Sequence, residues 1–371
     1  MASVLRGRAS LVDGERPYFY RLAEEGDAAA LRMLLAADAD IRVVDQLMPQ
    51  LRDSIKLEHP GQVLTEDAYR AAIAHKLGGR TEAEYGVWVY YPWRRQLVHM
   101  LDEVEFTRVR TIRNAYKITF EEQALLRTKK VGIIGLSVGQ SVSLCIAIER
   151  SAGEIRIADF DTLELSNLNR IRTGVHNLGL KKTTIVAREI AEIDPFIKVV
   201  CFHEGINEQN ADAFFDDGGA LDLLIEECDS VDIKLLARIK AKQRGIPVLM
   251  DTSDRGMVDI ERYDLDGSYP VLHGLIDPSI TPEFIRSLKS AQEKLEYVMP
   301  ILGADTISER MKSSLMELGK SITTWPQLGG DVALGGALCA NVGRRILLGD
   351  HIDSGRTYVD VNEIIPGSSK Q

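Results

Sequence analysis

One stretch near the middle of the chain holds residues whose types and spacing indicate chemistry. The apolar run Val131–Ile134 enters a turn of small residues that includes Gly135, Ser137 and Gly139. An amphipathic helix and a second apolar run follow, and that run ends on Asp159, 24 positions after Gly135. Free N–H groups at a helix start bind phosphates, and an acid at this spacing binds ribose hydroxyls. The stretch therefore predicts a β-α-β unit that binds a nucleotide.

The residues after this unit narrow the kind of nucleotide enzyme. The segment DFDTLELSNLNR runs from Asp159 to Arg170, and a Gly-x-x-Lys follows from Gly179 to Lys182. An apolar strand then ends at Asp229, and a helix rich in Ala and Gly lies near the C-terminus. A lone glycine-rich turn is weak evidence of function, whereas these motifs occur together and in a fixed order.

The ordered set resembles the signature of the ThiF/MoeB/HesA superfamily, over roughly residues 113–349. This superfamily comprises ATP-dependent adenylating enzymes that activate ubiquitin-like proteins, sulfur-carrier proteins and some peptides. The resemblance implies an α/β fold with a Rossmann-like, doubly wound and mostly parallel sheet. It also implies a homodimer in which the ATP site is completed across the interface.

The resemblance assigns nucleotide contacts to residues of the turn and of the segment after it. Asp159 would bind the ribose, and Asp161 lies close to it in the sequence. Asn167 would reach the phosphates. The turn residues that would contact the nucleotide are Gly135, Ser137 and Gly139.

Three further residues would carry the reaction by the same resemblance. In adenylation a carboxylate attacks the α-phosphorus of ATP while pyrophosphate leaves, so two anions must meet; cations and a metal lower their repulsion. Arg170 would contact the phosphates, Lys182 would neutralise their charge and Asp229 would hold Mg²⁺. Arg113, or alternatively Arg110, would be the arginine that reaches the partner subunit's ATP.

Each of these assignments has a structural alternative. Asp159 would also suit the cap of the turn after its strand, Asn167 is a common turn residue, and Asp229 would suit the N-cap of the next helix. Lys182 follows Lys181 at a predicted helix start, where a cation opposes the helix dipole unless a phosphate lies nearby. We favour the functional interpretation because the residues occur as one ordered set.

The turn departs from the G-x-G-x-x-G pattern of the superfamily. Ser137 stands where the second glycine lets a phosphate approach the backbone, and Gln140 stands where the third lets the helix pack on the strand. Serine is small and its hydroxyl is able to donate to a phosphate. Gln140 implies either altered helix packing or a partly filled pocket, so nucleotide binding is the prediction most in need of a test.

The four cysteines contain no C-x-x-C pair, which argues against a structural zinc site and a disulfide framework. Relatives that pass their product to a thioester use a cysteine after the sixth strand, but none lies between Cys228 and Cys339. We therefore expect no zinc and no thioester step. Cys145 and Cys228 are interpreted as core residues.

Composition sets limits on the class of protein. The 371 residues carry a formal net charge of −10, which argues against a general binder of nucleic acid or of anionic membranes. No apolar run approaches the roughly 18 residues of a membrane span, and the N-terminus lacks the apolar core of a signal peptide. We expect a cytoplasmic enzyme.

Two parts of the chain differ in pattern. Residues 1–105 predict a mainly helical subdomain: two or three helices over 22–57, with a strand over Gly86–Pro92. Residues 106–371 predict the adenylation domain, where strands and helices alternate as in a parallel sheet covered on both faces. We expect an antiparallel edge strand over 256–263, a charged helix over 285–297, and a close-packed helix after Trp325.

The function predicted from these observations is an ATP- and Mg²⁺-dependent adenylyltransferase that activates a carboxylate as an acyl adenylate. The carboxylate would belong to a metabolite or to the C-terminus of a small protein or peptide, and an external amine, thiol or internal amide would complete the reaction. One alternative is a non-catalytic nucleotide-binding or scaffold protein of the same fold. A less favoured one is an NAD(P)-dependent oxidoreductase, which leaves Lys182 and Asp229 without a joint role.

Overall fold

The computed structural model describes residues 14–303 and 306–366, and its contacts divide the chain into two compact units, Met1–Thr119 and Phe120–Gln371. This boundary lies later than the one expected after residue 105. The reason is α4 (Glu103–Thr111), whose Phe106 and Val109 pack against the core of the N-terminal unit. Within the described ranges, no helix is long and apolar enough to cross a membrane.

The N-terminal unit combines a small sheet with helices. Its strands are β1 (Tyr18–Tyr20), β2 (Arg42–Asp45), β3 (Val87–Tyr91) and β4 (Gln96–Met100), in the order β1-β3-β4-β2. Its longer helices are α1 (Asp27–Ala37), α2 (Leu47–Glu58), α3 (Glu66–Leu77) and α4. The strand expected over Gly86–Pro92 is confirmed as β3.

The other three strands of this sheet were not predicted, and β2 lies within the stretch expected to be wholly helical. Strands of three to five residues carry too little alternation to be recognised. Pro49 lies in the first turn of α2, where a missing N–H costs no hydrogen bond. Of the aromatic residues on and after β3, Tyr90 is buried, whereas Trp88 and Trp93 are half-buried.

The C-terminal unit is built on a seven-stranded sheet in the order β11-β10-β9-β8-β5-β6-β7. Its strands are β5 (Lys130–Ile134), β6 (Glu154–Ala158), β7 (Lys198–Phe202), β8 (Leu223–Glu226), β9 (Val248–Asp251), β10 (Met257–Glu261) and β11 (Gly355–Tyr358). The run from β7 to β9 is parallel. The expected antiparallel strand is confirmed as β10, but β11 pairs outside it, so β10 is not the edge.

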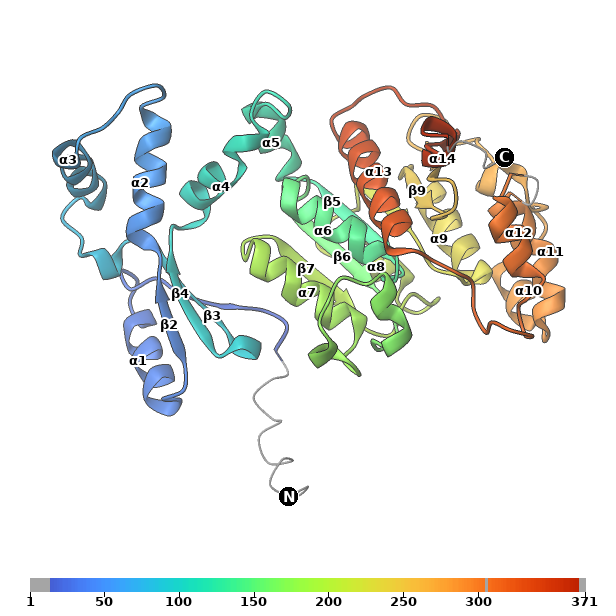
Figure 1. Cartoon of the computed structure of the whole chain (residues 1–371), viewed down its shortest axis with the longest axis horizontal. Coiled ribbons are helices and arrows are strands. Elements are labelled where there is room, and N and C mark those ends of the chain that lie inside the picture. Colours follow the sequence, from blue (N-terminus) through green and yellow to red (C-terminus); the bar gives the residue numbers. More distant parts are fainter. Residues whose placement is uncertain (1–13, 304–305, 367–371) are drawn as a thin grey trace, which may run out of the picture. The chain divides into compact units, whose positions relative to one another are not determined.

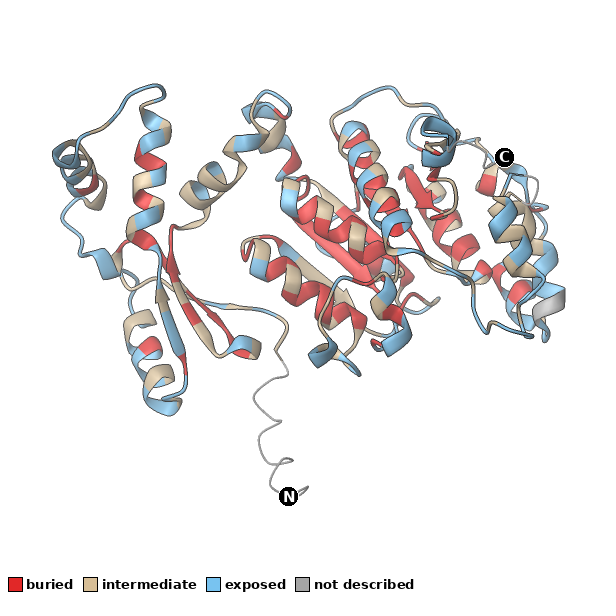
Figure 2. Cartoon of the chain, viewed as in Figure 1, coloured by how far each residue is buried: buried red, intermediate tan, exposed pale blue. Residues whose placement is uncertain are grey.

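Helices cover both faces of this sheet (Figure 1). The helices of this unit are α5 (Phe120–Leu126), α6 (Gly139–Glu149), α7 (Lys182–Ile193), α8 (Ala211–Asp216), α9 (Val231–Gln243), α10 (Pro282–Ser287), α11 (Ala291–Leu302), α12 (Glu309–Leu315), α13 (Gly329–Leu347) and α14 (Val361–Ile364). On β8, Leu224 packs in the core cluster of α8 and α9, whereas Leu223 faces Gly343 of α13. The predicted doubly wound, mostly parallel sheet is therefore present, with its inner strands buried and its edge strands β7 and β11 partly exposed (Figure 2).

Two details of the later segments refine the sequence prediction. The charged helix expected over 285–297 is two helices, α10 and α11, because the side chain of Ser290 accepts from the Glu293 N–H and starts a new helix. The close-packed helix is α13. A Cβ on its Gly336 would lie 2.3 Å from the Ser141 Oγ of α6, so the two helices approach too closely for a side chain there.

Candidate functional site

Two adjoining cavities open at the carboxyl ends of the parallel strands, where doubly wound sheets bind ligands. The turn cavity, of about 180 Å³, is lined by residues that include Gly135, Ser137, Asp159, Asp161 and Lys182. The large cavity, of about 430 Å³, is lined by residues that include Asn167, Arg170, Lys234, Asp251, Ile301 and Trp325. The segment Glu227–Asp229, after β8, lines both. The predicted residues of the C-terminal unit therefore divide between two connected spaces.

The glycine turn between β5 and α6 requires its glycines for steric reasons. Gly135 has a φ of +85°, and a Cβ there would lie 2.7 Å from the Cys228 backbone nitrogen and from the Glu227 carbonyl carbon. A Cβ on Gly139 would lie 2.8 Å from Cγ2 of Ile133. The turn thus presses against the end of β8 and brings the start of α6 to the cavity.

Asp159 lines the turn cavity and also holds the turn in shape. Its Oδ2 accepts from the Leu136 N–H at 2.7 Å, and its Oδ1 accepts from the Asp161 N–H at 2.7 Å. The residue is 8% exposed, and burial raises the pKa of its carboxyl above the ordinary value, although the nearby Lys182 acts in the opposite direction. Asp159 therefore caps the turn, as the structural alternative expected, and it also lines the cavity in which the predicted ribose contact would be made.

Lys182 joins residues that lie far apart in the sequence. It is the first residue of α7, and its Nζ donates to Asp161 Oδ2 at 2.7 Å and to Ser137 Oγ at 3.2 Å. The Asp161 carboxylate offsets the cost of an ammonium at a helix start. Ser137 thus has a polar partner inside the cavity, and a cation stands beside the turn where a phosphate would lie.

Asn167 and Arg170 line the large cavity rather than the turn cavity. The 3-10 helix Leu165–Asn169 carries Asn167, whose Oδ1 accepts from the Glu164 N–H at 3.0 Å. Arg170 donates through Nη1 to Asn169 Oδ1 at 2.9 Å, while its Nε is buried without a hydrogen-bond partner among the described residues. Burial lowers the pKa of Arg170, and the charge of Asp229 counteracts this.

Asp229 is exposed and lines both cavities. Among the described residues it has no hydrogen bond or ion pair. The N-cap position of α9 is Ser230, so Asp229 is not the helix cap that the sequence left open. A free carboxylate at the junction of the two cavities is an oxygen ligand of the kind that Mg²⁺ prefers. The residue therefore fits the predicted metal role.

Gln140 does not fill either cavity. It is 1% exposed, and its Nε2 donates to Glu189 Oε2 at 2.7 Å and to the Arg172 carbonyl oxygen at 3.1 Å. Its Oε1 accepts from the Arg172 N–H at 2.8 Å. Of the two outcomes expected from this departure, altered helix packing is the one present: the amide links α6 to α7 and to the loop before it.

Several residues that form the cavity walls were not among the predicted site residues. Ile206 and Ile233 give the turn cavity an apolar side, and Phe160, exposed at its rim, packs near Gly205. In the large cavity, Asp251 ends the apolar run of β9, and an acid at the end of a strand is the sequence signal that identifies it. The walls from α11 and from Trp325 carry no motif, so no sequence signal identified them.

Arg113 and Arg110 belong to the N-terminal unit. Arg113 is exposed on the 3-10 helix Ile112–Asn114, and Arg110 is half-buried on α4. The role of either arginine at a partner's ATP stays a prediction.

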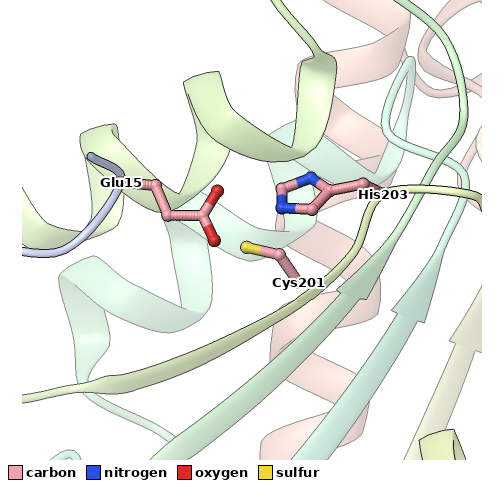
Figure 3. A group of neighbouring side chains, drawn as sticks. All are labelled: Glu15, Cys201 and His203. Atoms are coloured by element: carbon pink, nitrogen blue, oxygen red, sulfur yellow. The ribbon is translucent and has the colours of Figure 1, made fainter. Parts of the chain in front are cut away.

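The cysteine side chains show no activated thiol at the cavities. Burial and the Glu226 carboxylate hold the pKa of Cys228 well above its ordinary range, although Cys228 lines both cavities. Cys201 and His203 lie on and just after β7 (Figure 3). The His203 ring nitrogen Nδ1 is 2.7 Å from Thr183 Oγ1. Glu15 in the same figure belongs to the N-terminal unit.

Comparison with known proteins places a family model on this part of the chain. The ThiF family matches residues 110–258. An uncharacterised protein of Mycobacterium tuberculosis (strain CDC 1551 / Oshkosh) is 41% identical over 329 residues, which is 88% of this chain and 43% of that protein. The ubiquitin-like modifier-activating enzyme 5 of Bombyx mori is 25% identical over 156 residues, covering 39% of each chain. The chain thus spans less than half the length of these curated relatives.

Solved structures give more distant matches. The tRNA N6-threonylcarbamoyladenosine dehydratase TcdA of E. coli, in complex with ATP, is 16% identical, with a TM-score of 0.47 over 65% of this chain and 94% of that one. The protein PaaA is 15% identical, with a TM-score of 0.48 over 84% of this chain and 88% of that one.

Proposed function

We propose that this chain, whose residues 110–258 match the ThiF family, is an ATP- and Mg²⁺-dependent adenylyltransferase that activates a carboxylate. One observation carries the proposal: the Lys182 ammonium, hydrogen-bonded to Ser137 of the glycine turn, lines the turn cavity together with the free Asp229 carboxylate. A cation and a metal-ligating carboxylate in one cavity, beside the start of α6, are what a triphosphate requires.

The two cavities suggest how the substrates divide. ATP would lie in the turn cavity, with its ribose near Asp159 and Asp161, its base against Ile206 and Ile233, and its phosphates at the start of α6. Arg170, whose Nε has no partner among the described residues, would contact the phosphates from the large cavity. The carboxylate substrate would enter through the large cavity.

Mg²⁺ would be held by Asp229 and would offset the charge of the phosphates. Asp229 suits this role because no other described residue bonds its carboxylate. We propose a homodimer, with Arg113 or Arg110 contributing to the partner's site. The final acceptor would be external, because the Cys228 thiol is held protonated by its surroundings.

Calorimetric titration of the whole protein with ATP and Mg²⁺ tests the proposal. The expected result is binding by the wild type, about tenfold to a hundredfold weaker binding by Asp229→Ala, and unchanged binding by the control Asp353→Asn. Asp353 is a suitable control because its side chain is 87% exposed and it lines neither cavity. If the folded wild-type protein does not bind ATP, the proposed enzymatic function is contradicted and the scaffold alternative remains.

The non-catalytic alternative has one observation in its favour. Asp159, Asp161, Ser137 and Lys182 already satisfy one another, so the turn cavity is stable without a nucleotide. ATP–pyrophosphate exchange separates the alternatives, because a scaffold that binds ATP would not catalyse exchange. Titration with NAD(H) in place of ATP tests the less favoured hypothesis, that the protein is an NAD(P)-dependent oxidoreductase.

A further inference from the structure

Asp251, at the end of β9, is a buried carboxylate with an unused acceptor. The residue is 5% exposed and lines the large cavity. Its Oδ2 accepts from the Ser253 hydroxyl at 3.0 Å, but its Oδ1 is buried with no hydrogen-bond partner among the described residues. A buried acceptor without a donor is costly, so its presence points to a ligand that supplies one.

The surroundings of Asp251 are shaped around its carboxyl group. A Cβ on Gly335 of α13 would lie 1.9 Å from Asp251 Oδ2, so this helix leaves the space empty. On the β8 side, the Asp251 N–H donates to Glu227 Oε1 at 3.0 Å. Cys339 and Asp331 approach from α13, and neither is a cation.

Cations near this carboxylate are engaged elsewhere. The Nζ of Lys234, on α9, donates to Glu226 Oε2 at 3.1 Å, and Arg170 donates to Asn169. No ion pair joins Asp251 to a described residue. Burial raises the pKa of Asp251 to about 6, so at neutral pH the group is mostly ionised without a counter-ion.

We infer that the large cavity binds an amine as the acceptor of the activated acyl group, with Asp251 accepting its N–H. This inference rests on the proposed adenylation. Two further acids on the same wall, Glu164 and Asp229, would attract an ammonium and repel a thiolate. Val298 and Ile301 of α11 supply apolar surface for the carbon chain of the amine.

The step balances with the two substrates already named. The amine nitrogen attacks the acyl carbon, a C–N bond forms, and the bond from that carbon to the phosphate oxygen of AMP breaks. The ammonium first gives one proton to Asp251, which passes it to water at the cavity mouth, and the attacking nitrogen gives its second proton by the same route as the C–N bond forms. An amide, AMP and two protons are the products.

Titration of the whole protein with benzylamine at pH 8, followed by NMR of the ligand, tests the inference. Wild type is expected to bind benzylamine more tightly than benzyl alcohol. Asp251→Asn should weaken benzylamine binding about tenfold to a hundredfold and leave benzyl alcohol unchanged. The exposed control Asp353→Asn should bind as the wild type does. Benzylamine binding by the wild type should also fall as the pH drops below about 6, when Asp251 is protonated.

Equal benzylamine affinity in wild type and Asp251→Asn, or no preference over benzyl alcohol, would overturn the inference. Asp331→Asn removes a charge that raises the pKa of Asp251, so amine binding should persist to lower pH; this second variant covers the case in which Asp251→Asn fails to fold. Titration of the same proteins with ATP and Mg²⁺ reports on the proposed function separately. If the protein binds ATP but its affinity for benzylamine does not depend on Asp251, only the amine site is contradicted and the proposed function stands.

Discussion

The turn cavity and the large cavity share a wall but differ in how their polar groups are satisfied. In the turn cavity, Asp159 is bonded to two backbone N–H groups, and Lys182 is bonded to Asp161 and Ser137. In the large cavity, Asp251 Oδ1 and Arg170 Nε are buried without partners among the described residues. The first is organised before any ligand binds, whereas the second holds buried polar groups that no described residue satisfies.

The largest effect should come from breaking the organised cavity. Gly135→Ala places a Cβ 2.7 Å from the backbone of Glu227 and Cys228 at a positive φ, so backbone must move. We expect a loss of about 2–4 kcal/mol in the free energy of unfolding, with loss of ATP binding. Chemical denaturation measures the first. Gly267→Ala is the matched control, because no atom lies within 4 Å of its Cβ position. A stable Gly135→Ala would show that the turn is not held by this contact.

Asp251→Asn should act in the opposite direction on stability. The pKa of Asp251 rises from 3.8 to about 6 on folding, so its ionised form opposes folding above pH 6, and this penalty disappears as the pH falls toward 4. The shift of about 2 units corresponds to up to about 3 kcal/mol. Asp251→Asn should therefore be more stable than the wild type at pH 8, with the difference shrinking toward pH 4. Urea denaturation at the two pH values measures this, and a destabilised variant at pH 8 would contradict an unpaired charge.

Lys182→Met tests whether the ammonium of the turn cavity serves the nucleotide. We expect ATP affinity to fall about tenfold to a hundredfold, because a charge-assisted contact to phosphate is lost. Lys181→Met is the neighbouring control: its Nζ donates to the Phe160 and His203 carbonyl oxygens and does not line the turn cavity. Equal affinities in the two variants, measured by calorimetry, would assign Lys182 a purely structural role.

The smallest effect on ATP affinity should follow from Gln140→Ala. Its amide bonds Glu189 and Arg172, so we expect a loss of about 1–3 kcal/mol in the free energy of unfolding and unchanged ATP affinity. Thermal unfolding and calorimetry measure the two quantities. Gln62→Ala, at an exposed site, serves as control. A variant that lost ATP affinity but kept its stability would bring Gln140 into the nucleotide site.

The two cavities also differ in how far the sequence predicted them. The turn cavity follows from local order, because Gly135, Asp159 and Lys182 lie at strand ends and helix starts that a β-α-β pattern brings together. The wall of the large cavity comes from β9 and from α11, which carry no motif. Asn167 and Arg170 were expected at the phosphates, and they lie across the shared wall, in the large cavity.

The N-terminal unit shows the same limit at the level of the fold. Its helices follow from apolar spacing and from caps such as Gly78 after α3. Its sheet does not, because β1 and β2 have only three and four residues, and their pairing with β3 and β4 joins parts of the chain far apart in sequence. Non-local pairing of such short strands leaves little trace in local composition.

The contact between Gly135 and the end of β8 has a thermodynamic consequence. Since the segment Glu227–Asp229 forms one side of both cavities and is pressed by the glycine turn, a ligand that shifts this segment changes both spaces at once. Linkage then requires reciprocity: the factor by which nucleotide alters the affinity for a molecule in the large cavity equals the factor by which that molecule alters the affinity for nucleotide. The three residues Glu227–Asp229, which separate the two cavities, would thus couple the binding of one substrate to the binding of the other.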